Sequence, residues 1–368
     1  MSQNSQYIIQ RCIFVIIKSL KLNRFIIFFC AIILIIGALL ATFSNDFLPV
    51  SSNIIWDEKN NNSKNTYIKW VNFTPTYEAL LETSKLDIES HNNSEKYPIK
   101  YNWVELLAYI ACKNGGNFNN FGKKDLNLLI EKLNSGSTIE DLTKDLKYYS
   151  YYYEAYDAVL HNFIGKYEIE SINSSGETQV VEKYGIKAFS PIAKNYHFSH
   201  YSDFGASRSY GYKRTHLGND LLGSIGTPII AVESGIIEAI GWNQYGGWRI
   251  GIRSFDKKRY YYYAHLRKDH PYAANLELGQ TVRAGDVIGY LGMTGYSSKE
   301  NVNNINTPHL HFGMQLIFDE SQKDGVNQIW IDVYQIIEFL KKYSSEVYRV
   351  DNDYIRKFQI FESDLYEL

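Results

Sequence analysis

Five residues in the second half of the chain have side chains whose types and spacing suit metal binding and proton transfer: His216, Asp220, His265, His309 and His311. Catalytic zinc takes three ligands from His, Asp, Glu or Cys and keeps a fourth position for water, whose pKa it lowers to about 7. The His-x-x-x-Asp pair and one histidine of the His-x-His pair would complete this set. Two histidines would remain, and an ordinary imidazole pKa of about 6.5 suits proton transfer. The pattern therefore predicts one zinc site with two further imidazoles.

The spacing also indicates which elements position these residues. In an extended strand, residues i and i+2 point to the same face, with Cα atoms about 6.5 Å apart. One imidazole of the His309/His311 pair can therefore bind the ion while the other faces the substrate. His265 follows the tyrosine-rich run 260–264, which favours a strand. A second uncoordinated imidazole can thus arrive from an adjacent strand.

Short β-type runs with glycine punctuation surround the five residues. This texture predicts an antiparallel β-sandwich or barrel in which the ion bridges strands. The candidate strands are residues 229–232, 235–240, 249–253, 260–264, 287–290 and 311–317.

Several motifs occur in an order that resembles the lysostaphin-type (LytM-like) zinc peptidoglycan endopeptidases, over roughly residues 190–320. They are His216-x-x-x-Asp220, Ala264-His265-Leu266, Gly285-Asp286-Val287-Ile288-Gly289, Thr294-Gly295 and Pro308-His309-Leu310-His311-Phe312. The resemblance implies the fold called a duplicated hybrid motif, and one Zn²⁺ held by His216, Asp220 and His311. It also implies that His309 and His265 act on the water and the tetrahedral intermediate, and that peptide bonds in bacterial peptidoglycan are cleaved.

All five positions are kept, which argues against the inactive members of this family. Two alternatives stay open: a non-hydrolytic envelope or spore-coat scaffold, and an activator of another wall hydrolase. One departure is the polar, Asn-rich loop 296–307, which is longer than usual in the family and puts a substrate preference taken from the family in doubt. Trp242, Tyr245 and Tyr296 are candidate substrate contacts, although paired tryptophans equally suit core packing.

Other catalytic patterns are excluded by the residues. Leu217 follows His216, so there is no His-Glu-x-x-His helix there, and no Gly-x-Ser-x-Gly elbow lies near the histidines. Cys12, Cys30 and Cys112 are too far apart in sequence for a Cys-x-x-Cys metal or redox site.

The N-terminal part of the chain predicts a membrane anchor. Residues 25–43 form a run of about nineteen uncharged residues, long enough to span a bilayer. Residues 1–24 carry basic but no acidic residues, so the positive-inside rule places them in the cytoplasm. We therefore expect a single-pass protein of the cell membrane, with residues 44–66 as a polar linker and the catalytic part on the cell-wall side. A cleaved signal peptide is the alternative.

Residues 67–167 predict a helical domain of unassigned role. Trp103, Leu106, Leu107 and Ile110 recur at helical spacing, and Ser137 to Glu140 is a candidate capping box. The chain then continues into the zinc peptidase domain at 185–320 and ends in a helix (329–340) and tail within 325–368. The expected class is thus membrane-anchored α + β. A net charge of −2 does not indicate nucleic-acid binding, which needs a basic surface. The family resemblance and the apolar run 25–43 instead make peptidoglycan peptides and the lipid bilayer the expected partners.

Overall fold

The computed structural model describes residues 67–119, 121–209 and 213–362, which belong to one compact unit that begins at Tyr67. The predicted cytoplasmic segment 1–24, membrane span 25–43 and linker 44–66 lie outside the described residues. Within the described ranges, no helix is both long and apolar enough to cross a bilayer.

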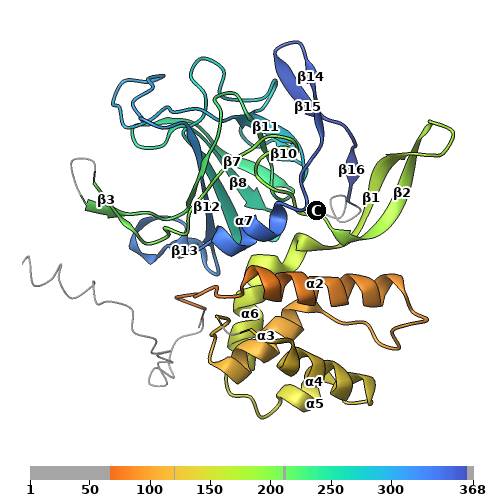
Figure 1. Cartoon of the computed structure of the whole chain (residues 1–368). Helices are drawn as coiled ribbons and strands as arrows, with labels where there is room; N and C mark the ends of the chain where they lie inside the picture. The colour runs from red at the N-terminus through yellow and green to blue at the C-terminus, as the bar shows by residue number, and fades with distance from the viewer. Residues whose placement is uncertain (1–66, 120, 210–212, 363–368) are drawn as a thin grey trace, which may run out of the picture. The chain divides into compact units, whose positions relative to one another are not determined.

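The first half of the described chain is helical, as its periodicity predicts (Figure 1). The helices are α2 (Tyr77–Asn92), α3 (Trp103–Asn114), α4 (Lys123–Asn134), α5 (Ile139–Thr143) and α6 (Tyr149–Leu160), followed by the 3-10 turn η1 (His161–Phe163). The start of α3 is set by Asn102, whose side chain accepts hydrogen bonds from the first free backbone N–H groups.

The predicted capping box at the start of α5 is wrong by one residue. Thr138, and not Ser137, is the N-cap, and its hydroxyl accepts a hydrogen bond from the backbone N–H of Asp141. The same hydroxyl donates to the Asp141 carboxylate at 3.1 Å. The helix therefore begins with a side-chain N-cap on Thr138.

The second half is rich in antiparallel strands, and all six predicted strand segments contain a strand. The strands are β1 (Ile164–Ile172), β2 (Thr178–Ile186), β3 (Ser207–Ser209), β4 (Lys213–Thr215), β5 (Asn219–Leu222), β6 (Pro228–Ile230), β7 (Gly235–Asn243), β8 (Gly247–Ser254), β9 (Arg259–Ala264), β10 (Thr281–Val282), β11 (Val287–Tyr290), β12 (His309–Leu316), β13 (Ile329–Ile331), β14 (Val347–Val350), β15 (Asp353–Arg356) and β16 (Ile360–Phe361). The largest sheet has the order β10-β7-β8-β9-β12-β13, with β5 also paired to β12, whereas β6 and β11 form a separate pair.

Strand β12 organises the large sheet because it pairs with three other strands. Along one edge, its first half pairs with β5 and its last residues pair with β13. Along the other edge it pairs with β9. The register sets His311 directly opposite Asp220 on β5 and opposite Ala264 on β9. Both halves of the predicted metal motif therefore meet on neighbouring strands.

The predicted C-terminal helix over 329–340 is correct only in its second half. Ile329 and Ile331 are buried in β13, which pairs with β12, and helix α7 covers Tyr334–Leu340. Asp332 separates the two elements, since its carboxylate accepts a hydrogen bond from the backbone N–H of Tyr334 at 2.9 Å. Short 3-10 turns, η2 (Glu320–Gln322) and η3 (Gly325–Asn327), precede β13.

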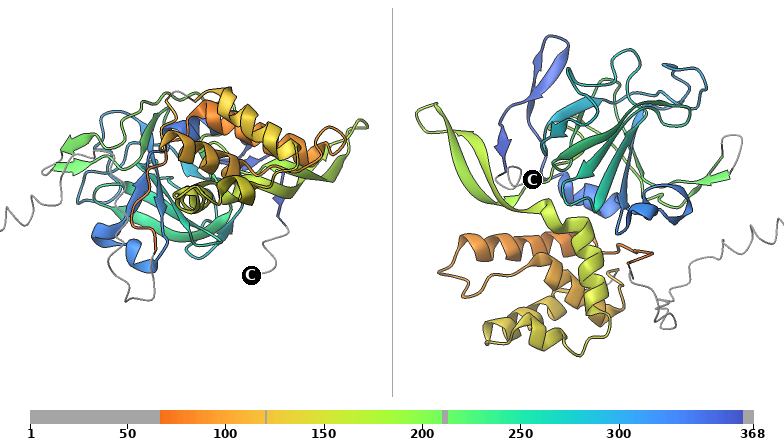
Figure 2. Two further views of the ribbon diagram at one scale, coloured as in Figure 1. Left: turned by 90° about the horizontal axis from the view of Figure 1, so that it is seen from below. Right: turned by 180° about the vertical axis from the view of Figure 1, so that it is seen from behind.

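The β1–β2 hairpin lies in sequence between the helices and the large sheet, and β16 pairs with its first strand. In both views of Figure 2 the hairpin extends away from the large sheet. Most of its residues are half-buried or exposed. The hairpin was not predicted, because neither of its strands contains a run of strongly strand-forming residues like the tyrosines of β9.

The helices and the large sheet share one hydrophobic core. The Trp103 ring on α3 lies 6.0 Å from the Phe339 ring on α7. Arg259, fully buried at the start of β9, donates to the backbone carbonyl of Ala158 on α6 at 2.8 Å and to Glu233 at 2.7 Å. Helix α6 thus holds the strand that leads directly to His265. The predicted boundaries between a helical domain and a peptidase domain stay predictions.

Candidate metal centre

The three predicted metal ligands converge on one point. The carboxylate Oδ1 of Asp220 lies 3.0 Å from Nε2 of His216 and 2.9 Å from Nδ1 of His311, and these two nitrogens are 3.1 Å apart. His216 is buried just before β5, and the other two side chains are partly buried. Among the described residues, these three form the group whose ligand atoms are arranged to hold a metal ion.

The orientation of His216 depends on a residue that the sequence did not single out. The Nδ1 atom of His216 lies 3.2 Å from the carboxylate of Asp203, and the guanidinium of Arg208 contacts Asp203 in turn. A carboxylate beside Nδ1 favours the proton on that nitrogen, which leaves Nε2 free to bind a metal ion. Asp203 belongs to no motif, so only the fold brings it to this place.

The two further histidines lie beside the same cluster. The ring of His265 is 4.8 Å from that of His309 and 5.9 Å from that of His311, between ring centroids. Nε2 of His309 is 3.6 Å from the Asp220 carboxylate. His265 follows directly after β9, which stops at Ala264 as predicted, and it takes a left-handed backbone conformation with φ of 65°.

Backbone carbonyls fix the tautomer of both histidines. Nδ1 of His265 lies 3.0 Å from the carbonyl oxygen of Thr294, and Nδ1 of His309 lies 2.8 Å from that of Thr307. Because a carbonyl oxygen only accepts hydrogen bonds, each Nδ1 carries the proton. Each Nε2 then has a free lone pair that is able to take a proton.

The electrostatics of the cluster keep its groups in forms that suit metal binding. Burial disfavours the Asp220 carboxylate, but the contacts with His216 and His311 outweigh it and hold its pKa well below the ordinary range. Burial, reinforced by the neighbouring His309 and His311, lowers the pKa of His265 well below that of a free imidazole. Asp220 is therefore ionised and His265 neutral at neutral pH.

Gly218 allows the segment between His216 and Asp220 to pass close to β12. A Cβ at this position would lie 2.6 Å from the carbonyl oxygen of Phe312 and 2.8 Å from Nε2 of His311. Any larger residue would thus press directly on a predicted metal ligand. The Gly between His216 and Asp220 is a packing requirement of the site.

The predicted substrate contacts divide into two groups. The Tyr296 ring lies 5.8 Å from that of His265, and its backbone N–H donates to the carbonyl oxygen of Tyr245, so these two residues are adjacent beside the centre. Trp242 instead packs edge-to-face on Trp248 at 5.6 Å, within an aromatic cluster. Their part in substrate binding stays a prediction.

The long loop 296–307 begins beside the centre and is fastened to its surroundings. The side-chain oxygen of Asn301 accepts hydrogen bonds from the Trp248 indole and from the backbone N–H of Asp269, both at 2.9 Å. The Asn301 amide nitrogen donates to the Asp269 carboxylate at 2.6 Å. Asn301, one of the asparagines that make this loop polar, is thus a residue that attaches it to its surroundings.

The donor atoms fit zinc. Zn–N and Zn–O bonds are about 2 Å long, so atoms bound to one ion lie no more than about 4 Å apart, and two imidazoles with a carboxylate form a three-ligand set that leaves one position for water. The observed separations of 2.9–3.1 Å lie within this limit. Fold and site together define the class: a β-rich domain with a candidate metal centre of two histidines and one aspartate.

Comparisons with known proteins agree with that class. Residues 214–326 match the model of peptidase family M23. The L-Ala–D-Glu endopeptidase of Bacillus subtilis (strain 168) is 40% identical over 124 residues, which are 34% of this chain and 36% of that protein. Lysostaphin of Staphylococcus staphylolyticus is 41% identical over 98 residues, which are 26% of this chain and 18% of that protein.

Among solved structures, the catalytic domain of the antimicrobial peptidase lysostaphin from Staphylococcus simulans is 31% identical, with a TM-score of 0.30, over 38% of this chain and 92% of that one. The chain spans about a third of the length of the first curated relative and less than a fifth of the second. Residues 214–326 belong to peptidase family M23, which confirms the predicted lysostaphin-type (LytM-like) resemblance.

Proposed function

We propose that the chain is a zinc-dependent endopeptidase that cleaves peptide bonds in bacterial peptidoglycan. The observation that carries the proposal is the convergence of His216, Asp220 and His311, whose ligand atoms lie within 4.8 Å of one another, with His265 and His309 beside them. The relatives named above as endopeptidases support the same chemistry. One zinc ion per domain would be held by these three residues.

When bound, zinc supplies a Lewis acid and lowers the pKa of a water molecule to about 7. His309 accepts the proton of the attacking water at Nε2, because its Nδ1–H is bound to the Thr307 carbonyl. His265 presents Nε2 with the same tautomer, so it stabilises the oxyanion or protonates the leaving amine only after it has received a proton. The proton that His309 takes from the water is the source, because the two rings lie 4.8 Å apart. Either histidine is therefore chemically able to act as base.

Digestion of purified peptidoglycan by the full chain tests this proposal. We expect new amino termini, identified by mass spectrometry of the released fragments, which also names the bond cut. A zinc chelator should stop their release and added zinc should restore it. Binding to peptidoglycan without any new amino terminus, in zinc-loaded protein, would favour a scaffold or an activator of another hydrolase instead.

We also propose that the protein is a single-pass protein of the cell membrane with its catalytic part on the cell-wall side. The support is the apolar run 25–43, preceded by basic residues and followed by a polar linker. Protease added to intact, wall-stripped cells should degrade a tag at the C-terminus and spare one at the N-terminus. Recovery of the C-terminal tag intact, or in the culture medium, would contradict an anchored outward orientation.

A further inference from the structure

A groove of about 420 Å³ extends from the metal centre along one face of the large sheet. Its lining includes His311 and Gln315 of β12, and Tyr260 and Tyr262 of β9. Side chains alternate along a strand, so these residues share one face, while the intervening Tyr261 is fully buried on the other. His311 thus belongs both to the lining of the groove and to the predicted metal ligands.

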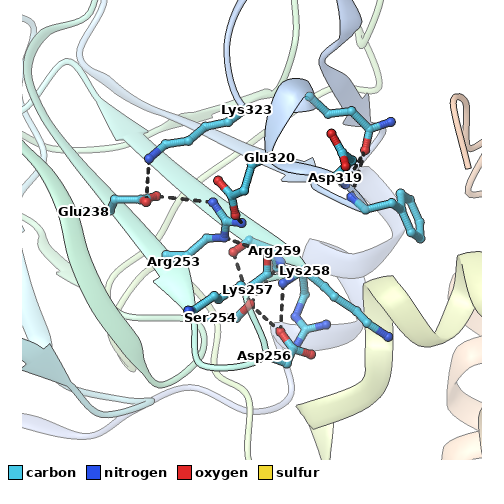
Figure 3. A network of polar contacts seen from close by, with 12 residues as sticks. Glu238, Arg253, Ser254, Asp256, Lys257, Lys258, Arg259, Asp319, Glu320 and Lys323 are labelled. Carbon is cyan, nitrogen blue, oxygen red and sulfur yellow. Dashed lines mark hydrogen bonds and ion pairs between the residues drawn. The ribbon is translucent and has the colours of Figure 1, made fainter. Parts of the chain in front are cut away.

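One of the two acidic side chains that line the groove, that of Glu238, is already neutralised. Figure 3 shows the Glu238 carboxylate between two cations, with Lys323 at 2.6 Å and Arg253 at 3.6 Å. The other acidic lining residue, Asp324, is exposed at the rim. Glu238 and Lys323 thus neutralise each other within the groove, whose lining also includes the cationic side chains of Arg214 and Arg249.

Arg249 lies on β8, and among the described residues its Nε atom has no hydrogen-bond partner. Within the described ranges its guanidinium makes no hydrogen bond or ion pair, and its Nε is buried. A guanidinium has five N–H donors, and a buried donor without an acceptor is costly unless a ligand supplies one. Arg253 shows the contrast, because on the same strand it is held by Glu238 and Glu320.

The position of Arg249 is close to the reacting centre. Arg249 and Arg214 line the same groove as Tyr262 and His311. The Tyr262 ring is 5.9 Å from the His311 ring. The Arg214 guanidinium carbon lies 4.6 Å above the Tyr296 ring, which borders His265. Both guanidinium groups therefore share the groove with a predicted zinc ligand.

We propose that this groove is a carboxylate-binding subsite, in which Arg249 contacts a free carboxylate of the peptide substrate near the bond that is cut. The planar fork of arginine matches a carboxylate with two parallel hydrogen bonds, and such charge-assisted pairs are about twice as strong as neutral ones. A carboxamide offers one acceptor and brings N–H groups toward a cation, so it binds less well. That this carboxylate belongs to a substrate rests on the function proposed above.

The test compares two peptidoglycan stem peptides that differ only in whether the glutamate α-carboxyl group is free or amidated. Their binding is measured by calorimetry with the full chain, loaded with zinc, in a His309→Ala background, in which hydrolysis is expected to be about 100- to 10,000-fold slower. We expect the free carboxylate to bind at least about tenfold more tightly. Arg249→Gln should reduce that ratio to about one, and Arg249→Lys should keep part of it.

Arg283→Gln is the matched control, because Arg283 lies outside the groove, against the Phe361 ring. This variant should keep the full ratio, and all variants should keep their zinc content and thermal unfolding midpoint. Equal binding of the two peptides, or a ratio that survives in Arg249→Gln, overturns the subsite. Cleavage of the two peptides by the chain that keeps His309 is measured in parallel. If the binding ratio holds but neither peptide is cut, the hydrolase function fails while the carboxylate subsite stands.

Discussion

Replacement of His309 by alanine is expected to lower peptidoglycan hydrolysis by about 100- to 10,000-fold, the usual contribution of a positioned general base. The imidazole Nε2 lies 3.6 Å from the Asp220 carboxylate and carries a free lone pair, because Nδ1–H is bound to the Thr307 carbonyl. Since His309 is not one of the three predicted ligands, zinc content should stay at one ion per chain. Initial rates of amino-terminus release and elemental analysis measure both quantities.

Two companion variants sharpen this prediction. His265→Ala removes the other free imidazole. If His309 is the base, His309→Ala should lower hydrolysis more than His265→Ala does. The exposed His197 is a matched control, and His197→Ala should keep full activity. A His309→Ala protein with normal zinc content and unchanged hydrolysis would refute the role assigned to His309, while a larger loss in His265→Ala would exchange the two roles.

Replacement of Asp220 by alanine is expected to abolish hydrolysis by removing the metal. Asp220 is the residue shared by the whole cluster, at 3.0 Å from Nε2 of His216 and 2.9 Å from Nδ1 of His311. Loss of a partner that only orients a ligand costs about 10- to 100-fold in metal affinity, so loss of a ligand should cost more than about 100-fold. Competition with a chromogenic zinc chelator measures the affinity.

A graded series tests whether this effect comes from the metal centre. Asp203→Ala should weaken zinc binding by about 10- to 100-fold, because Asp203 contacts His216 but is not placed as a ligand. Asp145→Ala, at an exposed position after α5, should change nothing. Zinc affinity in Asp220→Ala equal to that of the unchanged chain would remove Asp220 from the ligand set.

Sequence reasoning located the strands of the sheet better than it located their ends and partners. The tyrosine run of β9 and the apolar run of β11 were predicted because their composition is local evidence for a strand. The sequence predicts residues 329–331 as part of a helix, because three consecutive apolar residues fit the repeat of a helix and the repeat of a strand equally well. Only pairing with β12 makes them a strand, and that pairing depends on residues far away in the sequence.

The sequence by itself determined the family, the five chemical groups and the shared face of His309 and His311, because motif order and the two-residue period of a strand are local properties. The tertiary structure alone decided which groups meet. The register of β12 against β5 sets His311 opposite Asp220, and the fold adds Asp203 behind His216 and leaves the Arg249 Nε atom without a hydrogen-bond partner among the described residues. These are contacts between distant segments, and they follow from how strands pair and pack.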